Sequence, residues 1–294
     1  INTVITKSGN YLLSVLDTYD DVIFTRKFVL YENATTVPVS VIRSRNIQTV
    51  ATQQTIQFSI NHPGIRINNP RQEIHVTILK NNNWNERISD LQPTFFKQNQ
   101  LLYTYTNKTN FWGGNEYLNF DTKILRNKSL NIVRITKKEI YNHYLYPFTF
   151  NAFRNYTYSP DINGQFAVRT LEGNDNATEA DYALMHFSLQ VDEEFKEKEV
   201  YVYGAFNNFS IGEENRMSYS PKNQTYRTSI LLKQGFYNYT FATLGADALV
   251  NTNEINGSFF ETENEYTTII YFKASGSLYD RVIGVGSGYF NQNR

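Results

Sequence analysis

Carboxylates are the side chains of this 294-residue chain whose spacing comes nearest to a catalytic arrangement. Glu116 and Asp121 flank a short strand-like segment, and a glycosidase uses two such acids from separate parts of the chain. Glu261, Glu263 and Glu265 alternate, so in an extended strand they would face the same side. Buried together, three like charges would raise the pKa of one acid and create an acid catalyst, whereas on an exposed edge strand they only oppose strand pairing. We favour the exposed arrangement and predict that the chain has no catalytic residue and is not an enzyme.

The sequence lacks the residue types or the spacing that nucleophilic catalysis, phosphate binding and zinc binding require. The chain has no Cys, which removes zinc–thiolate sites and a Cys nucleophile. Gly286-Ser287-Gly288 is shorter than the G-x-S-x-G turn that presents a nucleophilic serine, and Gly113-Gly114 lacks the Lys and Ser/Thr that complete a phosphate-binding loop. The histidines lie far apart and lack the i, i+4 spacing of a zinc-binding helix: His62, His75, His143 and His186. We therefore predict no metal site and no cofactor.

Charge and hydropathy exclude two further classes of protein. Lys plus Arg and Asp plus Glu each number 28, so the net charge is zero and the pI is near 7.1. A nucleic-acid-binding protein of this size should carry a basic surplus, so we predict no nucleic-acid partner. The longest apolar runs are only a few residues, well short of the roughly 20 that a transmembrane helix needs, so we expect no direct membrane span.

Composition predicts the fold class. The chain contains 22 Tyr, 21 Phe and 35 Asn. Aromatic residues suit pleated, half-buried strands, while Asn suits the turns between strands. No segment has the apolar period of a helix of three or more turns. We predict an all-β chain with little helix, built from tandem β-sandwich domains of the Ig-like or early-set kind.

Turn signals and a charge run suggest three domains. Residues 11–17 and 22–32 read as strands joined by a turn, and we assign residues 1–47 to the C-terminal strands of a truncated first β-domain. Alternatively, these strands extend the sheet of the next domain. We assign 48–195 to a central β-sandwich and 196–294 to a C-terminal Ig-like early-set sandwich, with the charged segment DEEFKEKE as the boundary between them.

Two aromatic turns are candidates for partner contact. Trp112, Gly113, Gly114 and Asn115 form a turn opened by glycines, and Trp84 follows three consecutive Asn residues. Each turn could present its Trp to a partner, because Trp is enriched at the centres of interfaces. Each could instead be a tight turn whose Trp fills the end of a sandwich. We keep these five residues as partner-binding candidates.

One resemblance concerns the last hundred residues. The segments VYVYGAFNNFS, from Val200, and KQGFYNYTF, from Lys233, resemble early-set Ig-like sandwiches related to glycogen-binding modules. Those modules bind sugar by stacking it on exposed Trp, and Phe209 stands at the position of that Trp. The resemblance implies an alternative function as a carbohydrate-binding protein of a polysaccharide-handling system, with an aromatic platform around Phe206, Phe209 and Tyr237.

A second resemblance spans nearly the whole chain. Five segments occur in order, namely SGNYLLSV, RKFVLYE, FWGGNEYLNFD, ADYALMHFSLQ and the pair NGSFFETENEYTTIIYF with SLYDRVIGVG. Together they resemble the plug protein family of the type IX secretion system of Bacteroidetes, formerly a domain of unknown function, whose members begin with a further β-domain. The resemblance implies a non-enzymatic periplasmic protein, associated with the outer membrane. It would bind the translocon barrel of that membrane and close the periplasmic opening.

Overall fold

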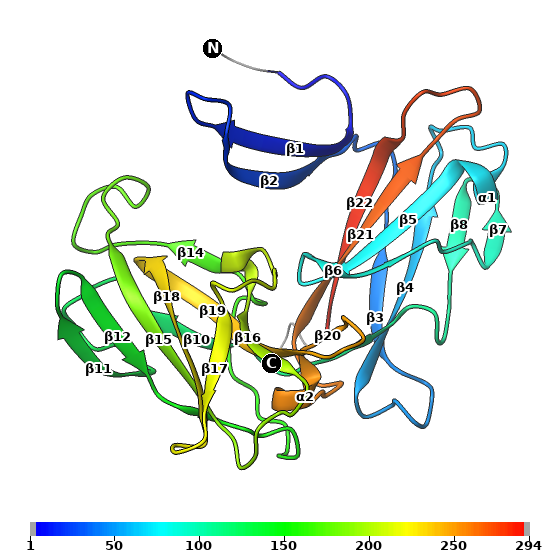
Figure 1. The fold of residues 1–294 in the computed structure, drawn as a ribbon. Coiled ribbons are helices and arrows are strands. Elements are labelled where there is room, and N and C mark those ends of the chain that lie inside the picture. Colours follow the sequence, from blue (N-terminus) through cyan, green and yellow to red (C-terminus); the bar gives the residue numbers. More distant parts are fainter. Residues whose placement is uncertain (1–3, 291–294) are drawn as a thin grey trace. The chain divides into compact units, whose positions relative to one another are not determined.

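The computed structural model of the chain describes residues 4–290 and is almost entirely β (Figure 1). Its two α-helices, α1 (Pro70–Glu73) and α2 (Asn253–Asn256), are four residues each, and a single 3-10 turn covers Ala205–Asn207. The prediction of an all-β, sandwich-type fold with little helix is therefore confirmed. In the part of the chain that is described, neither helix is long and apolar enough to cross a membrane.

The chain forms two compact units whose boundaries differ from the predicted domains. Unit 1 contains residues 4–50, 54–111 and 264–290, and unit 2 contains residues 51–53 and 112–263. The boundary predicted near 195 is wrong, because β15 (Tyr182–Gln190) pairs along its whole length with β18 (Thr225–Lys233). The predicted C-terminal domain is also divided, because β21 (Asn264–Phe272) pairs with β5 (Ile74–Lys80) in unit 1.

The strands predicted for a separate first domain belong to unit 1. Strands β1 (Gly9–Leu16) and β2 (Val22–Leu30) form a two-stranded sheet of their own. The next strand, β3 (Val39–Arg43), pairs with β4 (Gln53–Asn61). The alternative that these residues extend the next sheet is therefore correct for β3 and not for the hairpin.

Unit 1 is a sandwich of two antiparallel sheets. One sheet has the strand order β22-β21-β5-β6 and the other has the order β3-β4-β8-β7, with β9 pairing with β4. The strands not yet bounded are β6 (Asn83–Ser89), β7 (Phe95–Lys97), β8 (Gln100–Tyr103), β9 (Asn110–Trp112) and β22 (Arg281–Phe290). Ile56 and Ile60 of one sheet and Ile78 and Ile270 of the other are fully buried in one core. Alternating apolar residues on facing sheets therefore hold this unit together.

Unit 2 is one large sheet with the order β10-β19-β16-β17-β18-β15-β12-β11. Three short strands pair with members of this sheet outside that order: β13 pairs with β15, and both β14 and β20 pair with β19. The strands not yet bounded are β10 (Leu118–Asp121), β11 (Ile132–Lys137), β12 (Tyr141–Leu145), β13 (Phe148–Thr149), β14 (Phe166–Val168), β16 (Glu199–Tyr203), β17 (Arg216–Ser220), β19 (Gly235–Leu244) and β20 (Val250–Asn251). Phe120, Phe187, Tyr239 and Phe241, which come from three strands spread along the sheet, share one buried aromatic core. The sheet must therefore curl round this core.

Candidate functional site

The hairpin β1–β2 exposes a face of apolar side chains. Strand register places Tyr11 opposite Phe28 and Val15 opposite Phe24, with Leu13 between them on the same face. These five apolar residues surround the exposed Arg26, which is the partner of Leu13. Leu13 is 52% exposed, Phe24 is 45% exposed and Phe28 is 38% exposed. We call these five residues the apolar hairpin face. Contiguous exposed apolar side chains of this kind mark sites of protein interaction.

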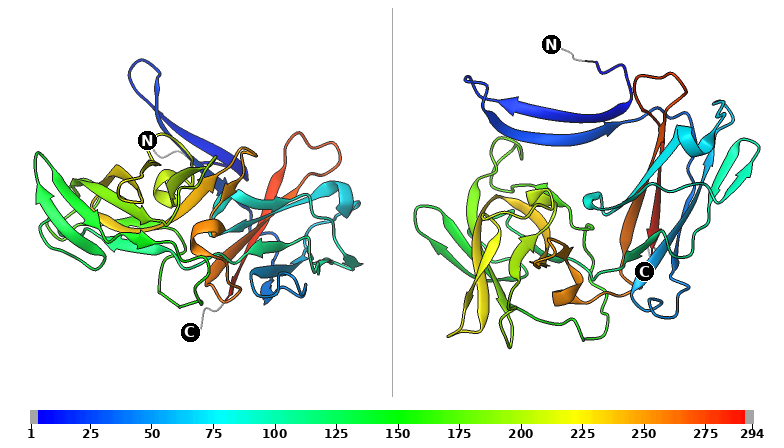
Figure 2. Two further views of the ribbon diagram at one scale, coloured as in Figure 1. Left: turned by 60° about the horizontal axis from the view of Figure 1, so that its bottom comes forward. Right: turned by 45° about the vertical axis from the view of Figure 1, so that its right-hand side comes forward.

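The other face of the hairpin is exposed as well. Leu12, Leu16 and Ile23 are 58%, 46% and 62% exposed, and Thr25 and Lys27 lie among them. A two-stranded sheet is at best marginally stable alone and needs something to pack against. Figure 2 shows the hairpin, in dark blue, extending beyond the two sheets of unit 1. The hairpin therefore presents its apolar residues outward.

Polar contacts fix the base of the hairpin to unit 1. The Ser8 hydroxyl donates to Glu32 Oε1 at 2.6 Å, and the backbone N–H of Val282 donates to Ser8 Oγ at 3.0 Å. The Arg281 guanidinium binds both oxygens of Glu32, with the Nε–Oε1 distance 3.0 Å. This ion pair holds the pKa of Glu32 below its usual value. Val29 packs beside Val282, so the base is anchored while the rest of the hairpin extends outward.

The predicted partner loop at Trp112 is mostly an internal clamp. The backbone N–H of Gly114 donates to Ser258 Oγ at 3.0 Å, and its carbonyl accepts the N–H of Phe259 at 2.9 Å. Asn115 donates through its side chain to the carbonyl of Asn256 at 2.9 Å. Gly113, Gly114 and Asn115 thus hold two segments of unit 2 together. Of the four predicted loop residues, Trp112 has the most open side chain, at 48% exposure.

Trp84 is half-buried in unit 1. It packs beside Leu79, Ile269 and Val282, in the cluster that also receives Val29 from the hairpin base. This position favours the interpretation that Trp84 fills a core of unit 1. Contact of Trp84 with a partner stays a prediction.

The aromatic platform of the carbohydrate alternative is not formed at the predicted residues. Phe209 is 5% exposed and Tyr237 is 2% exposed. Phe206 is half-buried and packs edge-on against Tyr237 at 6.1 Å between ring centroids. Sugar stacking needs an open ring face, which two of these three residues do not offer. Carbohydrate binding therefore stays a prediction without a located site.

Three carboxylates of unit 2 lie near one another. Glu116 is 7% exposed, and its Oε1 accepts hydrogen bonds from Tyr156 Oη and from the backbone N–H of Glu263, the latter at 3.2 Å. Asp161 accepts the backbone N–H of Tyr117. The pKa of Glu116 is raised to about 7 and that of Asp161 to about 6; burial is the largest cause in both cases, and the charge of Glu263 contributes to both raised values. The sequence suggested Glu116 and Glu263 separately and gave no signal for Asp161.

One carboxyl group of this acidic cluster, that of Glu116, lines a neighbouring cavity. A cavity of about 340 Å³ in unit 2 is lined by Glu116, Asn115 and Tyr239, and its wall contains neither Asp161 nor Glu263. A glycosidase needs two carboxyl groups that flank the bond to be cleaved. Glu116 therefore faces this cavity as a lone carboxyl group.

The raised pKa of Glu116 predicts a pH-dependent stability. Because the pKa of Glu116 is about 7 in the folded chain and 4.5 for an ordinary glutamate carboxyl group, the folded state binds the proton more tightly. The resulting stabilisation is complete below pH 4.5 and is lost as the pH rises through about 7. We expect Glu116→Gln, which cannot ionise, to raise the free energy of unfolding at about pH 8 by about 3 kcal/mol and to change little near pH 4. Urea unfolding at the two pH values measures this difference.

The exposed Glu139 supplies the matched control. Glu139→Gln should leave the free energy of unfolding unchanged at both pH values. Equal stability of Glu116→Gln and the unaltered chain at about pH 8 would show that folding does not raise the pKa of Glu116.

The remaining predicted acids have structural partners. Glu265 lies in β21 of unit 1, where it accepts Tyr289 Oη at 2.9 Å. Asp121 forms an ion pair of 3.1 Å with Lys123. Glu261 and Glu263 precede β21 and are partly exposed, so the three alternating acids do not form one strand. No group of three His, Asp or Glu side chains within residues 4–290 is arranged to hold a metal ion.

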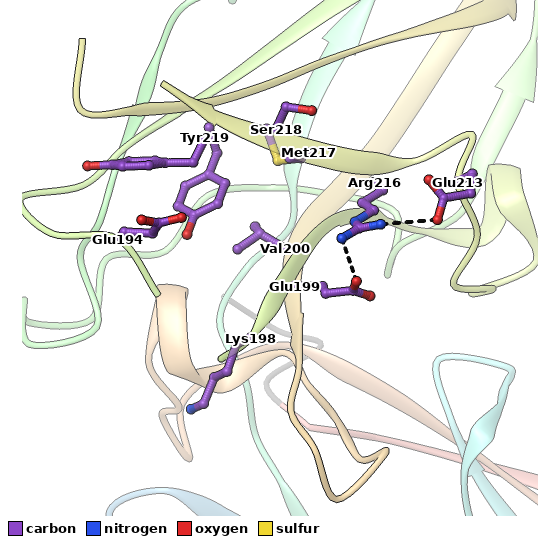
Figure 3. A pocket seen from close by; sticks show the side chains of 10 residues that line it. Glu194, Lys198, Glu199, Val200, Glu213, Arg216, Met217, Ser218 and Tyr219 are labelled. Carbon is purple, nitrogen blue, oxygen red and sulfur yellow. Dashed lines mark hydrogen bonds and ion pairs between the residues drawn. The ribbon is translucent and has the colours of Figure 1, made fainter. Parts of the chain in front are cut away.

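A second cavity of unit 2, about 310 Å³, is lined by charged side chains (Figure 3). Arg216 points between two carboxylates, with its guanidinium 2.6 Å from Glu199 and 3.2 Å from Glu213. Lys198, at the other end, is paired with Glu254 at 2.5 Å. Both cations are thus already neutralised, and partly exposed ion pairs of this type contribute little to stability. Both cations that line this cavity are therefore already paired with carboxylates, and Glu194 adds a further negative charge to its wall.

Comparisons with known proteins identify a structural relative. No family model and no curated protein matches the chain. The crystal structure of a hypothetical protein from Parabacteroides merdae does match, with a TM-score of 0.91 and 30% sequence identity over 97% of this chain and 72% of that one. The chain belongs to the family of this protein. Membership establishes the fold of the family, and the description of the relative assigns it no activity.

Proposed function

We propose that the chain is a plug protein of the type IX secretion system. In this proposal it acts in the periplasm without enzymatic activity, binds the outer-membrane translocon barrel and closes its periplasmic opening. The support from the sequence is the ordered recurrence of five segments that resemble this family.

The apolar hairpin face carries the proposal. The first two resembling segments, SGNYLLSV and RKFVLYE, form β1, most of β2 and the Ser8–Glu32 anchor at the base. These segments therefore build an apolar surface that the rest of unit 1 leaves exposed. A protein that seals an opening needs such a surface, because burial of apolar side chains against a partner supplies the binding free energy.

The binding free energy that these side chains could supply is large enough for this role. Full burial of a Leu or Phe side chain contributes about 1.5–3 kcal/mol, so several such residues can dominate an interface. The hairpin is anchored at its base, so less conformational freedom is lost when it docks. The balanced charge of the chain adds no long-range repulsion from a partner of either sign.

Copurification tests the proposal. The tagged protein, expressed in a bacterium that has a type IX secretion system, is extracted from the envelope in mild detergent and captured. We expect an outer-membrane barrel protein to elute with it in a stable complex. Recovery of the protein as a free monomer, with no envelope protein attached, would contradict the proposal.

A further inference from the structure

A row of four side chains crosses four neighbouring strands of unit 2. The strands are β11, β12, β15 and β18 (Figure 1). Arg134 of β11 is paired with Tyr144 of β12, Tyr144 with His186 of β15, and His186 with Ser229 of β18. The guanidinium of Arg134 lies 3.9 Å from the centre of the Tyr144 ring. The Tyr144 and His186 rings stack at 4.2 Å with only 4° between their planes. Ser229 Oγ lies 2.7 Å from His186 Nδ1. The four side chains therefore form one continuous stack on one face of the sheet.

Two hydrogen-bond partners, Asn142 and Ser229, hold the His186 ring in place. The Asn142 amide group donates to the carbonyl of Ile140 at 3.0 Å, which turns its Oδ1 toward His186 Nε2 at 2.9 Å. Because this oxygen can only accept, Nε2 carries a hydrogen, while Nδ1 lies against the Ser229 hydroxyl. Burial, and then the positive charges of Lys138 and Arg134, lower the pKa of His186, which favours its uncharged form. The row thus contains no negative charge that could balance Arg134.

Two guanidinium groups lack an acidic partner here. Arg134 and Arg227 line a cavity of about 600 Å³ together with His186, Ser188 and Ser229. Within residues 4–290, no ion pair engages either arginine. Stacking on Tyr144 uses the flat face of the Arg134 guanidinium and leaves its in-plane N–H groups free. That edge is the part of arginine that binds carboxylate or phosphate in a two-point contact.

We propose that this face of unit 2 binds a ligand through two oxyanion groups, carboxylate or phosphate, one at Arg134 and one at Arg227. Arg227 lies on β18, two residues before Ser229, and is paired with Ser188 of β15. It is therefore at the β18 end of the row, whereas Arg134 is at the β11 end. Three inter-strand steps of about 4.8 Å separate β11 from β18, or about 14 Å at the backbone. This separation favours two anionic groups on one ligand over a single small ion. Rigid stacking preorganises Arg134 for the contact.

Titration with four probes at constant ionic strength tests the proposal. Citrate and glucose 1,6-bisphosphate carry two or more oxyanion groups, whereas acetate and inorganic phosphate carry one. Backbone amide shifts of the ¹⁵N-labelled protein report binding. We expect one of the first two probes to bind saturably and about tenfold or more tightly than its single-group counterpart. The probe with the higher affinity identifies the oxyanion as carboxylate or phosphate.

Arginine variants locate the site. Arg134→Gln and Arg227→Gln should each weaken binding of the preferred probe about tenfold or more. Arg227 is exposed, so its variant is expected to fold even if Arg134→Gln disturbs the stack. Arg154→Gln, at another exposed position of unit 2, should bind unchanged. The proposal is overturned if neither two-group probe saturates, if it binds no more tightly than the single-group probe, or if Arg154→Gln loses as much affinity as Arg227→Gln.

Discussion

The double variant Leu13→Glu and Phe24→Glu is expected to reduce the barrel protein recovered with the chain at least about tenfold. Both side chains belong to the apolar hairpin face and are exposed in the free protein. Placing two carboxylates where apolar side chains should be buried removes their contribution and adds a desolvation cost. Quantification of the captured barrel relative to captured bait measures the effect.

The same variant should fold normally, because exposed positions rarely alter stability by more than about 0.5 kcal/mol. Its thermal midpoint should therefore match that of the unaltered chain. Thr25→Glu with Lys27→Glu, on the other face of the same hairpin, is the matched control and should retain most of the barrel. Equal recovery with both variants would show that the apolar hairpin face does not make the contact.

Gly113→Ala is expected to lower the free energy of unfolding of unit 2 by about 3 kcal/mol or more. A β-carbon at this position would lie 1.9 Å from the carbonyl oxygen of Phe259 and 2.8 Å from its carbonyl carbon. Both atoms are backbone, so they cannot move without breaking the clamp. The hydrogen bond from Gly113 N–H to the Thr52 carbonyl, at 2.9 Å, would be lost with them. Urea unfolding monitored by circular dichroism measures the change.

Gly64 provides the comparison. A β-carbon added there meets no atom within 4 Å, so Gly64→Ala should leave stability within about 0.5 kcal/mol. If Gly113→Ala unfolds at the same urea concentration as Gly64→Ala, the close approach at Phe259 is not a determinant of the fold.

Local features of the fold were predictable from the sequence because they depend on neighbouring residues. The abundance of Tyr, Phe and Asn indicated strands and turns, and the hairpin predicted over 11–17 and 22–32 corresponds closely to β1 and β2. The turn between them is closed by Asp17, whose side chain accepts the N–H groups of Tyr19 and Asp21. Such Asp-centred turns are visible in sequence.

Pairing between distant strands was not predictable in the same way. The charged segment at 192–199 resembles a linker, yet it is a surface turn between β15 and β16 of one sheet. Strand β15 pairs with β18 more than thirty residues later, and β21 pairs with β5 across about two thirds of the chain. Register between such strands depends on the complete core, which spacing along the chain does not encode.

The candidate sites also combine features that neighbouring residues determine with features that depend on pairing between distant strands. The apolar residues Leu12, Leu13, Val15 and Leu16 occupy both faces of β1, but only the structure shows that neither face is covered by another sheet. The glycines at 113 and 114 could be a partner loop or a tight structural turn by sequence alone. The structure shows Gly114 bonded to Ser258 and Phe259, about 145 positions later, and Gly113 bonded to Thr52. Arg134, Tyr144, His186 and Ser229 come from four separate strands, and only the sheet brings them into one row.

Site-specific photo-crosslinking in living cells tests most directly whether the hairpin docks on a translocon barrel. A photoreactive amino acid replaces Leu13 of the apolar hairpin face in one strain and the exposed Lys222 in another. We predict an adduct with the outer-membrane barrel from position 13 and a much weaker one from position 222. Irradiation that joins the barrel to position 222 and leaves position 13 unreacted would contradict this account.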